Sequence, residues 1–394
     1  MQADAGLVVL SAQSAAGLLG QVVNSGTVAA QGLSADGGTV RLLASSHLQH
    51  SGRVSVDAGT QGRGGSATLL ADLANPGSQT AVSGSLSARG GQAGGDGGFI
   101  ETSASQLQHA GQARVDTSAP QGRTGTWLLD PQDFTIAARN GNITGAALSL
   151  ALASNNITIQ TTDTSASCST GASCTGGSVG NGDIFVNDSV SWSSDRTLTL
   201  NAWRDIRVNA PISVTGAGGL AFKFGQAGTP DDMLPAAGGY RLTAPVNLSP
   251  NASFSTTYLR DGPTTPTTTT QYSIVVASAD KVAGKSVGLE DVGLTGNYVL
   301  GANLNTSTTP ALANWTPIGT DANAFDGSFD GLGHTITGLT VSGAGANNSH
   351  VGLFGVLRPT TNFMTFESTP GLVQNVGLID ANVSGLSQVG ALVG

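Results

Sequence analysis

The sequence predicts an all-β fold, a right-handed parallel β-helix (solenoid) with loop insertions and one or two short helices. Composition is the first reason: glycine supplies 57 of the 394 residues, while only 10% of residues are charged and 5% are aromatic. Soluble domains usually carry about 25% charged residues. Small, β-branched and turn-forming residues instead favour many short strands joined by tight turns.

An internal repeat is the second reason. The stretches SGTVAAQG, SGRVSVDAG, SGSLSARGG and AGQARVDTS carry Gly26, Gly52, Gly84 and Gly111, which are 26, 32 and 27 residues apart. A second motif, GGTVRLLAS, GGSATLLAD and DGGFIETS, falls between them. Repeats of this length indicate a solenoid, and strand-rich repeats indicate a parallel β-helix, whose stacked coils share one narrow core.

The stretch GTWLLDPQDFTI separates the regular repeat from a less regular region. Trp127 and Leu129 are expected to pack into the core. Pro131 cannot donate to a strand ladder, so Asp130 and Pro131 are expected to turn the chain. An aromatic ring beside Asp130 and Asp133 could also mark a binding site, but the surrounding repeats favour a structural corner formed by Trp127, Leu129, Asp130 and Pro131.

Beyond this corner the predicted elements are less regular. Residues 146–153 are rich in Ala and Leu and predict a short helix, and a second helical turn is expected at 289–292. Strands are expected at 157–159, 183–186, 198–200, 206–208 and 272–276. The predicted divisions are a repeat-bearing β-helix (1–133), a decorated β-helix with loop insertions (134–260), a Thr/Pro connector (261–270) and a last β-helix (271–394) that continues beyond the chain.

Two cysteines, Cys168 and Cys174, lie in the loop CSTGASC. So short a loop can close as a disulfide in an oxidising compartment, and this is the favoured interpretation. A free dithiol or half of a metal site is the alternative.

Several runs carry a family resemblance. The runs GGDGGFIETS, VDTSAPQGRTGTWLLDPQDFTI, NITGAALSLALASNNITIQ and LTLNAWRDIRVNAPI resemble large exoproteins of the filamentous haemagglutinin type. The resemblance spans residues 94–221. It implies export from a Gram-negative bacterium by two-partner secretion, with an outer-membrane transporter as partner, and a role as an adhesin.

The C-terminal region resembles the GLUG repeat, named for its Gly-Leu-any-Gly pattern. The resemblance rests on FDGSFDGLGHTITGLTVSG, VGLFGVL, VQNVGLIDANVSG and VGALVG. Such repeats occur in secreted β-helical surface proteins. Together with the first resemblance, this implies a secreted or cell-surface location.

Patterns that could carry chemistry are weak. Residues 279–286 match a relaxed phosphate loop, but Ala279 replaces its first glycine and no helix is predicted to follow. Asp326 and Asp330 lack the closing glutamate of a calcium loop and are read as turn acceptors. No catalytic or zinc-binding arrangement occurs among the histidines, so no enzyme activity, cofactor or metal is predicted. The histidines are His47, His50, His109, His334 and His350.

The net charge of the chain excludes one class of binding partner. The chain carries −9 with a pI near 4.8 and has no cluster of Lys or Arg, which argues against nucleic acid. The two resemblances imply the favoured function, a segment of a secreted adhesin, which would be a monomeric rod that attaches to a cell through a glycan or protein receptor. Loops 161–182, 226–270 and 343–350 are expected to bind, because stacked strands are committed to the core. A passive stalk for a distal toxin or effector, and less strongly a polysaccharide-active enzyme, are the alternatives.

Overall fold

The computed structural model describes residues 2–3, 6–14, 19–32, 35–162, 181–226, 239–259, 269–306, 312, 314–342, 349–358, 360–362, 367–369 and 371–394. Within them the fold is all-β and its strands pair mainly in parallel, which confirms the all-β, parallel part of the prediction. The chain forms two compact units. The first comprises Met1–Ala210, Gly219–Arg241 and Thr256–Thr269, and the second Pro211–Gly218, Leu242–Ser255 and Thr270–Gly394.

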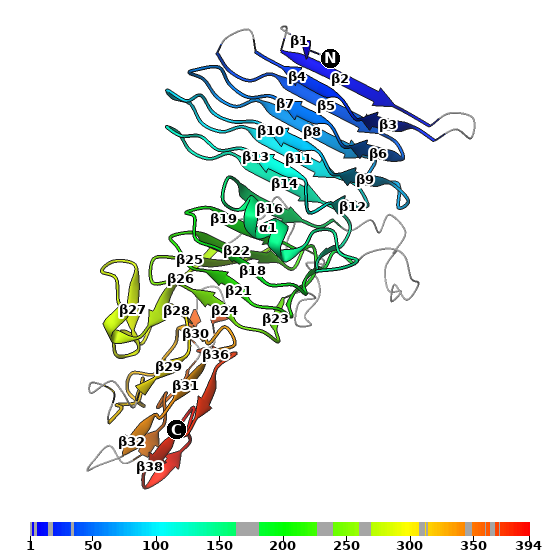
Figure 1. The fold of residues 1–394 in the computed structure, drawn as a ribbon. Coiled ribbons are helices and arrows are strands. Elements are labelled where there is room, and N and C mark those ends of the chain that lie inside the picture. The colour runs from blue at the N-terminus through cyan, green and yellow to red at the C-terminus, as the bar shows by residue number, and fades with distance from the viewer. Residues whose placement is uncertain are drawn as a thin grey trace. The chain divides into compact units, whose positions relative to one another are not determined.

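The first unit begins with repeats of three strands. These strands are β1 (Gln2–Ala3), β2 (Leu7–Ala12), β3 (Gln21–Asn24), β4 (Thr27–Ala30), β5 (Thr39–Ala44), β6 (His47–His50), β7 (Arg53–Ser55), β8 (Ser66–Ala71), β9 (Gln79–Val82), β10 (Ser85–Ser87), β11 (Phe99–Ser103), β12 (Gln106–His109), β13 (Arg114–Asp116) and β14 (Thr126–Asp130). They form three parallel sheets with the orders β1-β4-β7-β10-β13, β3-β6-β9-β12 and β2-β5-β8-β11-β14 (Figure 1). Each strand therefore pairs with its counterpart in the next repeat.

The pairing keeps the same register from repeat to repeat. Leu42 pairs with Leu69, and Leu69 pairs with Thr102. Alternation along each strand sends every second side chain into the core, so Ala67, Leu69 and Ala71 of β8 are fully buried. Because these inward side chains are small or aliphatic, a chain with few aromatic residues can still bury a continuous thin core.

Glycine pairs precede the strands β5, β8 and β11, where neighbouring repeats approach closely. A Cβ atom placed on Gly65 would lie 1.9 Å from the backbone oxygen of Gly38, and one placed on Gly98 would lie 2.0 Å from that of Gly65. No side chain can be accommodated at such distances. Glycine is needed here for the close approach of two backbones.

Replacing Gly98 by alanine is therefore expected to force the repeats apart and to lower the free energy of unfolding by about 1–3 kcal/mol. Gly111→Ala is the matched control, because a Cβ at Gly111 meets no atom within 4 Å. Its effect is expected to stay within about 0.5 kcal/mol. Urea unfolding followed by circular dichroism measures both variants, and equal effects would show that close approach does not explain the glycine at position 98.

The rest of the first unit keeps the parallel pairing but begins a new sheet. Its elements are β15 (Phe134–Ile136), α1 (Gly145–Ala151), β16 (Asn156–Gln160), β17 (Ile184–Val186), β18 (Val190–Trp192), β19 (Thr197–Asn201), β20 (Ile206–Val208), β22 (Gly219–Phe224) and β23 (Tyr240–Leu242). The order β14-β16-β19-β22 continues the long-strand sheet, and β15-β17-β20-β23 forms the new one. The strands predicted in this region are confirmed as β16, β17, β19 and β20.

The short helix predicted at 146–153 is confirmed as α1. Thr144 caps it, since its Oγ1 accepts the N–H of Ala147 at 3.2 Å. Leu148 is fully buried, whereas Leu150 is 54% exposed, so only one face of the helix is docked. A helix of this length is not stable alone. The packing of Leu148 must therefore hold it in place.

Most strands of the second unit are two to four residues long, and the strand Ser253–Tyr258 belongs to the first unit from Thr256 onward. Its elements are β21 (Ile212–Val214), β24 (Val246–Leu248), β25 (Ser253–Tyr258), β26 (Thr269–Val276), η2 (Ser278–Asp280), β27 (Ser286–Gly288), η3 (Leu289–Asp291), β28 (Asn297–Leu300), β29 (Leu304–Asn305), β30 (Ser328–Asp330), β31 (Thr335–Thr337), β32 (Thr340–Ser342), β33 (Ser349–Val351), β34 (Thr360–Asn362), β35 (Glu367–Thr369), β36 (Leu372–Gln374), β37 (Gly377–Ile379), β38 (Asn382–Ser384) and β39 (Ser387–Val389). The orders β26-β28-β30-β36, β29-β31-β37, β32-β38 and β33-β39 are parallel, and β34 pairs with β35 in antiparallel fashion. The predicted strand at 272–276 lies in β26, and the predicted turn of helix is the 3₁₀ helix η3.

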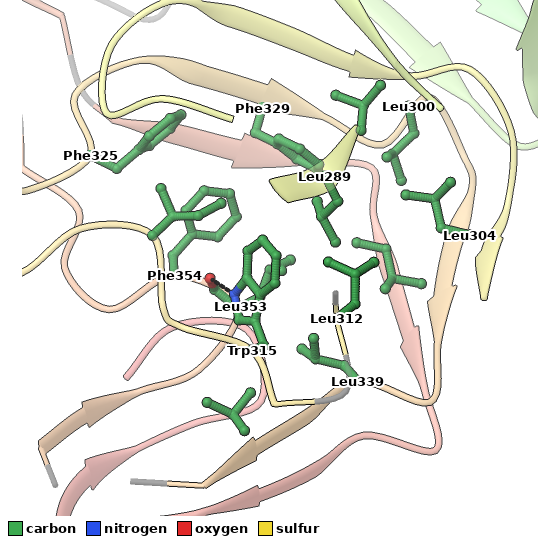
Figure 2. Close-up of a cluster of buried hydrophobic side chains, with 14 of the residues drawn as sticks. Leu289, Leu300, Leu304, Leu312, Trp315, Phe325, Phe329, Leu339, Leu353 and Phe354 are labelled. Carbon is green, nitrogen blue, oxygen red and sulfur yellow. Dashed lines mark hydrogen bonds between the residues drawn. The ribbon is translucent and has the colours of Figure 1, made fainter. Parts of the chain in front are cut away.

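The core of the second unit is aromatic where that of the early repeats is aliphatic. Figure 2 shows Trp315 among leucine and phenylalanine side chains, with its Nε1–H donating to the backbone oxygen of Leu353 at 2.9 Å. The ring of Phe354 lies 5.0 Å from that of Phe325 and 5.4 Å from that of Phe329, between centroids. Larger rings therefore fill the space inside this unit.

Candidate functional site

The four predicted corner residues lie where β14 ends. Trp127 and Leu129 face the core and are 1% and 0% exposed. Asp130 is the last residue of β14, and Pro131 is buried but belongs to no strand. The chain then turns into β15.

Two contacts hold the Trp127 ring inside the core. Its Nε1–H donates to Thr102 Oγ1 at 3.1 Å, and its ring centroid lies 4.6 Å from that of His109. The indole therefore has both a polar partner and a tilted aromatic neighbour, an arrangement that buried tryptophans favour.

Trp127→Phe is expected to lower the free energy of unfolding by about 1–3 kcal/mol, because it leaves a packing gap and removes the donor to Thr102. Thermal or urea unfolding measures the change. Thr102→Val supplies the control, since it removes the acceptor instead. If Trp127→Phe costs as much in the Thr102→Val background as in the wild type, the hydrogen bond does not contribute.

The Asp130 carboxyl group is buried and weakly hydrogen-bonded. Its Oδ1 has no hydrogen-bond partner among the described residues, and its Oδ2 accepts a long bond of 3.4 Å from Gln160 Nε2. Burial, assisted by the negative charge of Glu101, raises the pKa of Asp130 to about 7. Near pH 7 the Asp130 carboxyl group is therefore partly protonated. Because its Oδ1 is shielded from solvent, the group belongs to the core and cannot exchange a proton with a substrate.

Two buried histidines lie in the same region. The His50 Nδ1 lies 3.1 Å from Asn24 Nδ2, and its Nε2 lies 3.2 Å from the backbone oxygen of Ser85. In His109, burial and then the nearby His50 lower the pKa to about 3. The His109 Nε2 has no hydrogen-bond partner in the described part of the chain. Both rings are therefore neutral members of the core near pH 7.

The predicted disulfide cannot be placed. Cys168 and Cys174 lie in residues 163–180, outside the described residues, and so the pairing stays a prediction. Most of the three loops predicted to bind also lies outside the described residues, and their role stays a prediction. The ranges concerned are 163–180, 227–238, 260–268 and 343–348.

The stretch that resembles a phosphate loop is engaged in other contacts. Lys281 Nζ lies 2.9 Å from a Glu290 carboxylate oxygen and 2.8 Å from one of Asp291. The Ser286 Oγ accepts the N–H of Val282 at 2.9 Å. A strand and the short helix η3 follow, where phosphate binding would need the N-terminus of a longer helix. These contacts favour a structural turn.

The acidic and imidazole candidates of the second unit also make structural contacts. Asp330 Oδ1 accepts the N–H of Leu332 at 2.8 Å, which is the turn contact expected for it. His334 Nε2 lies 2.9 Å from the backbone oxygen of Val246. Across the described ranges, no three His, Cys, Asp or Glu side chains come together as metal ligands.

A cleft opens where one sheet of the first unit ends. β12 is the last strand of the sheet β3-β6-β9-β12. Asn142 bridges its free edge to β15: Nδ2 donates to the backbone oxygen of Leu107 at 2.7 Å, and Oδ1 accepts the N–H of Thr135 at 2.6 Å. The backbone oxygen of Asn142 accepts the N–H of His109 at 2.7 Å. No further strand of the described residues pairs with β12, and Asn142 satisfies part of its free edge instead. A cleft remains beside Asn142.

The cleft has a volume of about 470 Å³ and a largely polar lining. Gln106 and Gln108 project from β12, and Gln132 and Asp133 lie just before β15. The opposite side is formed around Asn140. Such a lining offers many hydrogen-bond donors and acceptors in a fixed arrangement.

A second hollow of about 290 Å³ adjoins the cleft and shares Gln108, Asn140 and Gly141 with it. It extends across the sheet to Gln49 and Ala81. The two hollows together are called the amide cleft below.

The amide cleft was not predicted from the sequence. Its signal is the pair HLQH at 47–50 and QLQH at 106–109, in which Gln49, Gln106 and Gln108 face outward. That pattern places Gln49 and Gln108 on one face, but the end of the sheet at β12 depends on pairing between distant residues.

Comparisons with known proteins give partial likenesses. No family model and no solved structure matches the chain. A protein of Evansella cellulosilytica that is named as a Gly-rich membrane protein is 38% identical over 89 residues, covering 19% of this chain and 10% of that protein. Halomucin of Haloquadratum walsbyi is 42% identical over 74 residues, covering 19% of this chain and 1% of halomucin. The chain therefore spans a small fraction of either relative. No helix in the described ranges is long and apolar enough to cross a membrane.

Proposed function

We propose that the repeats are coils of a right-handed parallel β-helix and that the chain is a segment of a secreted, cell-surface adhesin. The observation that carries this proposal is the unshifted parallel pairing of all three strands from one repeat to the next. Parallel strands need a crossover between them, and right-handed crossovers are strongly preferred. Three short strands that surround a thin apolar core meet this requirement.

Two further observations support a surface location. The partial relatives are named as a Gly-rich membrane protein and a halomucin. The resemblance of residues 94–221 to filamentous haemagglutinin-type exoproteins implies export through an outer-membrane transporter. Because the strands are committed to pairing and to the core, a partner would meet the outward side chains and the loops. Attachment to a glycan or protein receptor on another cell is the function that such a surface suits best.

A passive stalk is the second candidate function. The halomucin match occupies 1% of that protein, so sequence of this kind can form a very small part of a long chain. As a stalk, the segment would space a toxin or effector away from the cell and bind nothing itself. Neither function requires catalysis.

A cell-attachment assay separates the two. Fluorescent beads coated with residues 1–394 are expected to attach to host or bacterial cells, and the same chain in solution is expected to compete with them. Beads coated with an unrelated parallel β-helix of similar negative charge serve as the control. If circular dichroism shows a folded chain and no tested cell type retains the beads above control, the stalk is favoured.

A further inference from the structure

We propose that the amide cleft binds a neutral glycan. This inference rests on the proposed adhesive function and gives it a site and a class of receptor. It depends on three features of the cleft, namely its spacing, its free amide groups and its charge.

The spacing comes from the register of three strands. Gln49 of β6 pairs with Ala81 of β9, and Ala81 pairs with Gln108 of β12. All three side chains point outward from the sheet. Neighbouring strands lie roughly 4.8 Å apart, so the two glutamines stand roughly 10 Å apart with only a methyl group between them. This leaves a hollow with an amide on each side, into which a sugar ring can fit.

The amide groups differ in how far they are already engaged. Gln106 Oε1 accepts from Gln79 Nε2 at 3.2 Å, and Asn142 bridges β12 and β15. Gln49, Gln108 and Asn140 are exposed, and their side chains make no hydrogen bond to another described residue. The first group fixes the walls of the cleft. The second leaves donors and acceptors open, and an amide can serve a sugar hydroxyl in both roles.

The charge of the lining favours a neutral ligand. No Lys or Arg is among the described residues that line the two hollows, so nothing there would neutralise a sulfate or carboxylate. Asp133 is the acidic residue of the lining, and its Oδ1 already accepts the N–H of Asp183 at 2.8 Å. An uncharged ligand with many hydroxyl groups fits this chemistry best.

Size and rigidity agree with a glycan. The main hollow, at about 470 Å³, lies within the range of roughly 300–1,000 Å³ that small-ligand sites occupy. The adjoining hollow extends it along the sheet, as a short oligosaccharide would need. Gln49 and Gln108 stand on strands and not on loops, so binding costs little backbone conformational entropy. Among the described residues that line the cleft there is no exposed aromatic ring, and a single site is therefore expected to bind weakly and to act through many copies.

The test uses beads that carry many copies of residues 1–394 on an array of neutral oligosaccharides (glucans, mannans and galactans) and of sialylated and sulfated ones. The wild-type chain is expected to bind at least one neutral group. The double variant Gln108→Ala/Asn140→Gly is expected to weaken that binding about tenfold or more. Asn140 has a φ of 55°, so glycine removes its amide without straining the turn.

Gln21→Ala is the matched control. Gln21 is an exposed glutamine on β3 of the same sheet, three strands from β12, and it does not line the cleft. Its removal is expected to leave glycan binding unchanged. The proposal fails if the folded chain binds no neutral oligosaccharide, if it binds only charged ones, or if the double variant binds as well as wild type.

The cell-attachment assay distinguishes this failure from failure of the adhesive function. If the double variant attaches to cells as the wild type does while glycan binding is absent from both, adhesion stands and the amide cleft is overturned. If glycan binding depends on Gln108 and Asn140 but no cell is bound, the cleft stands and the adhesive function is overturned. If the wild type binds both glycans and cells and the double variant binds neither, the result supports the amide cleft and the adhesive function.

Discussion

The wild-type protein is expected to lose about 3 kcal/mol more stability than a His109→Leu variant when the pH is lowered from 7.5 to 4. Burial lowers the pKa of His109 to about 3 from an ordinary value of 6.5. Each pKa unit corresponds to about 1.4 kcal/mol, so the 2.5 units between pH 6.5 and 4 give about 3 kcal/mol. Leucine is close in size and cannot be protonated.

The direction follows from proton binding. Between pH 6.5 and about 3, the unfolded chain binds a proton at His109 and the folded chain does not. Acid therefore favours unfolding in this window, and the stability is fully present above pH 6.5. The whole window is worth about 5 kcal/mol, which is comparable to the total stability of many domains.

Urea unfolding of both proteins at several pH values between 8 and 4 measures this effect. At pH 8 the difference between them reports packing and the burial of the neutral ring, because the histidine is uncharged in both the folded and the unfolded chain. The extra slope below pH 6.5 reports the proton. If the two stability curves run parallel from pH 7.5 to 4, His109 is not the acid-sensitive group.

Asp130→Asn is expected to stabilise the protein by about 4 kcal/mol at pH 8 and to have little effect at pH 4. The folded pKa of Asp130 is about 7 and its ordinary value is 3.8. The folded chain thus holds the proton more tightly, and stability is lost as the pH rises from 3.8 through 7. At pH 8 the folded state must contain a buried carboxylate, which asparagine avoids while its oxygen can still accept from Gln160.

Asp57→Asn is a control that is expected to change the stability at pH 8 in the opposite direction. Burial works to raise the pKa of Asp57, but hydrogen bonds from the side chain and backbone of Arg89 outweigh it and hold that pKa below its ordinary value. The Arg89 backbone N–H and Nη2 lie 2.8 and 2.9 Å from the Asp57 carboxylate. The amide should therefore destabilise the protein at pH 8. A destabilising effect of Asp130→Asn at pH 8 would contradict the burial argument.

Local sequence predicted the strands of the repeats and several later ones, such as β16, β17, β19 and β20. In SATLLA at 66–71, alternate small and aliphatic residues go inward, and the structure buries Ala67, Leu69 and Ala71. The helix at Gly145–Ala151 could be predicted because its residues have high helix propensity and Thr144 can cap it. These features depend on neighbours within a few residues, and one sequence contains that information.

Long-range pairing could not be predicted in the same way. The sheet that ends at β12 does so because Asn142, 33 residues after His109, takes the place of the next strand. The division into units is also non-local, since 211–218 and 242–255 group with 270–394. The amide cleft arises from the first of these events. The outward-facing glutamines could be predicted from the sequence, but the hollow between them depends on long-range strand pairing and could not.

The residue-for-residue pairing of successive repeats has an evolutionary consequence. A strand such as β8 meets nearly the same surface on both sides, because β5 and β11 present matching positions to it. Duplication or loss of one whole repeat by recombination would therefore restore the same contacts at the junction. Loss of part of a repeat would not. Length in this region can thus change in steps of one repeat, provided that each added copy keeps the inward aliphatic positions and the glycines that let neighbouring backbones approach.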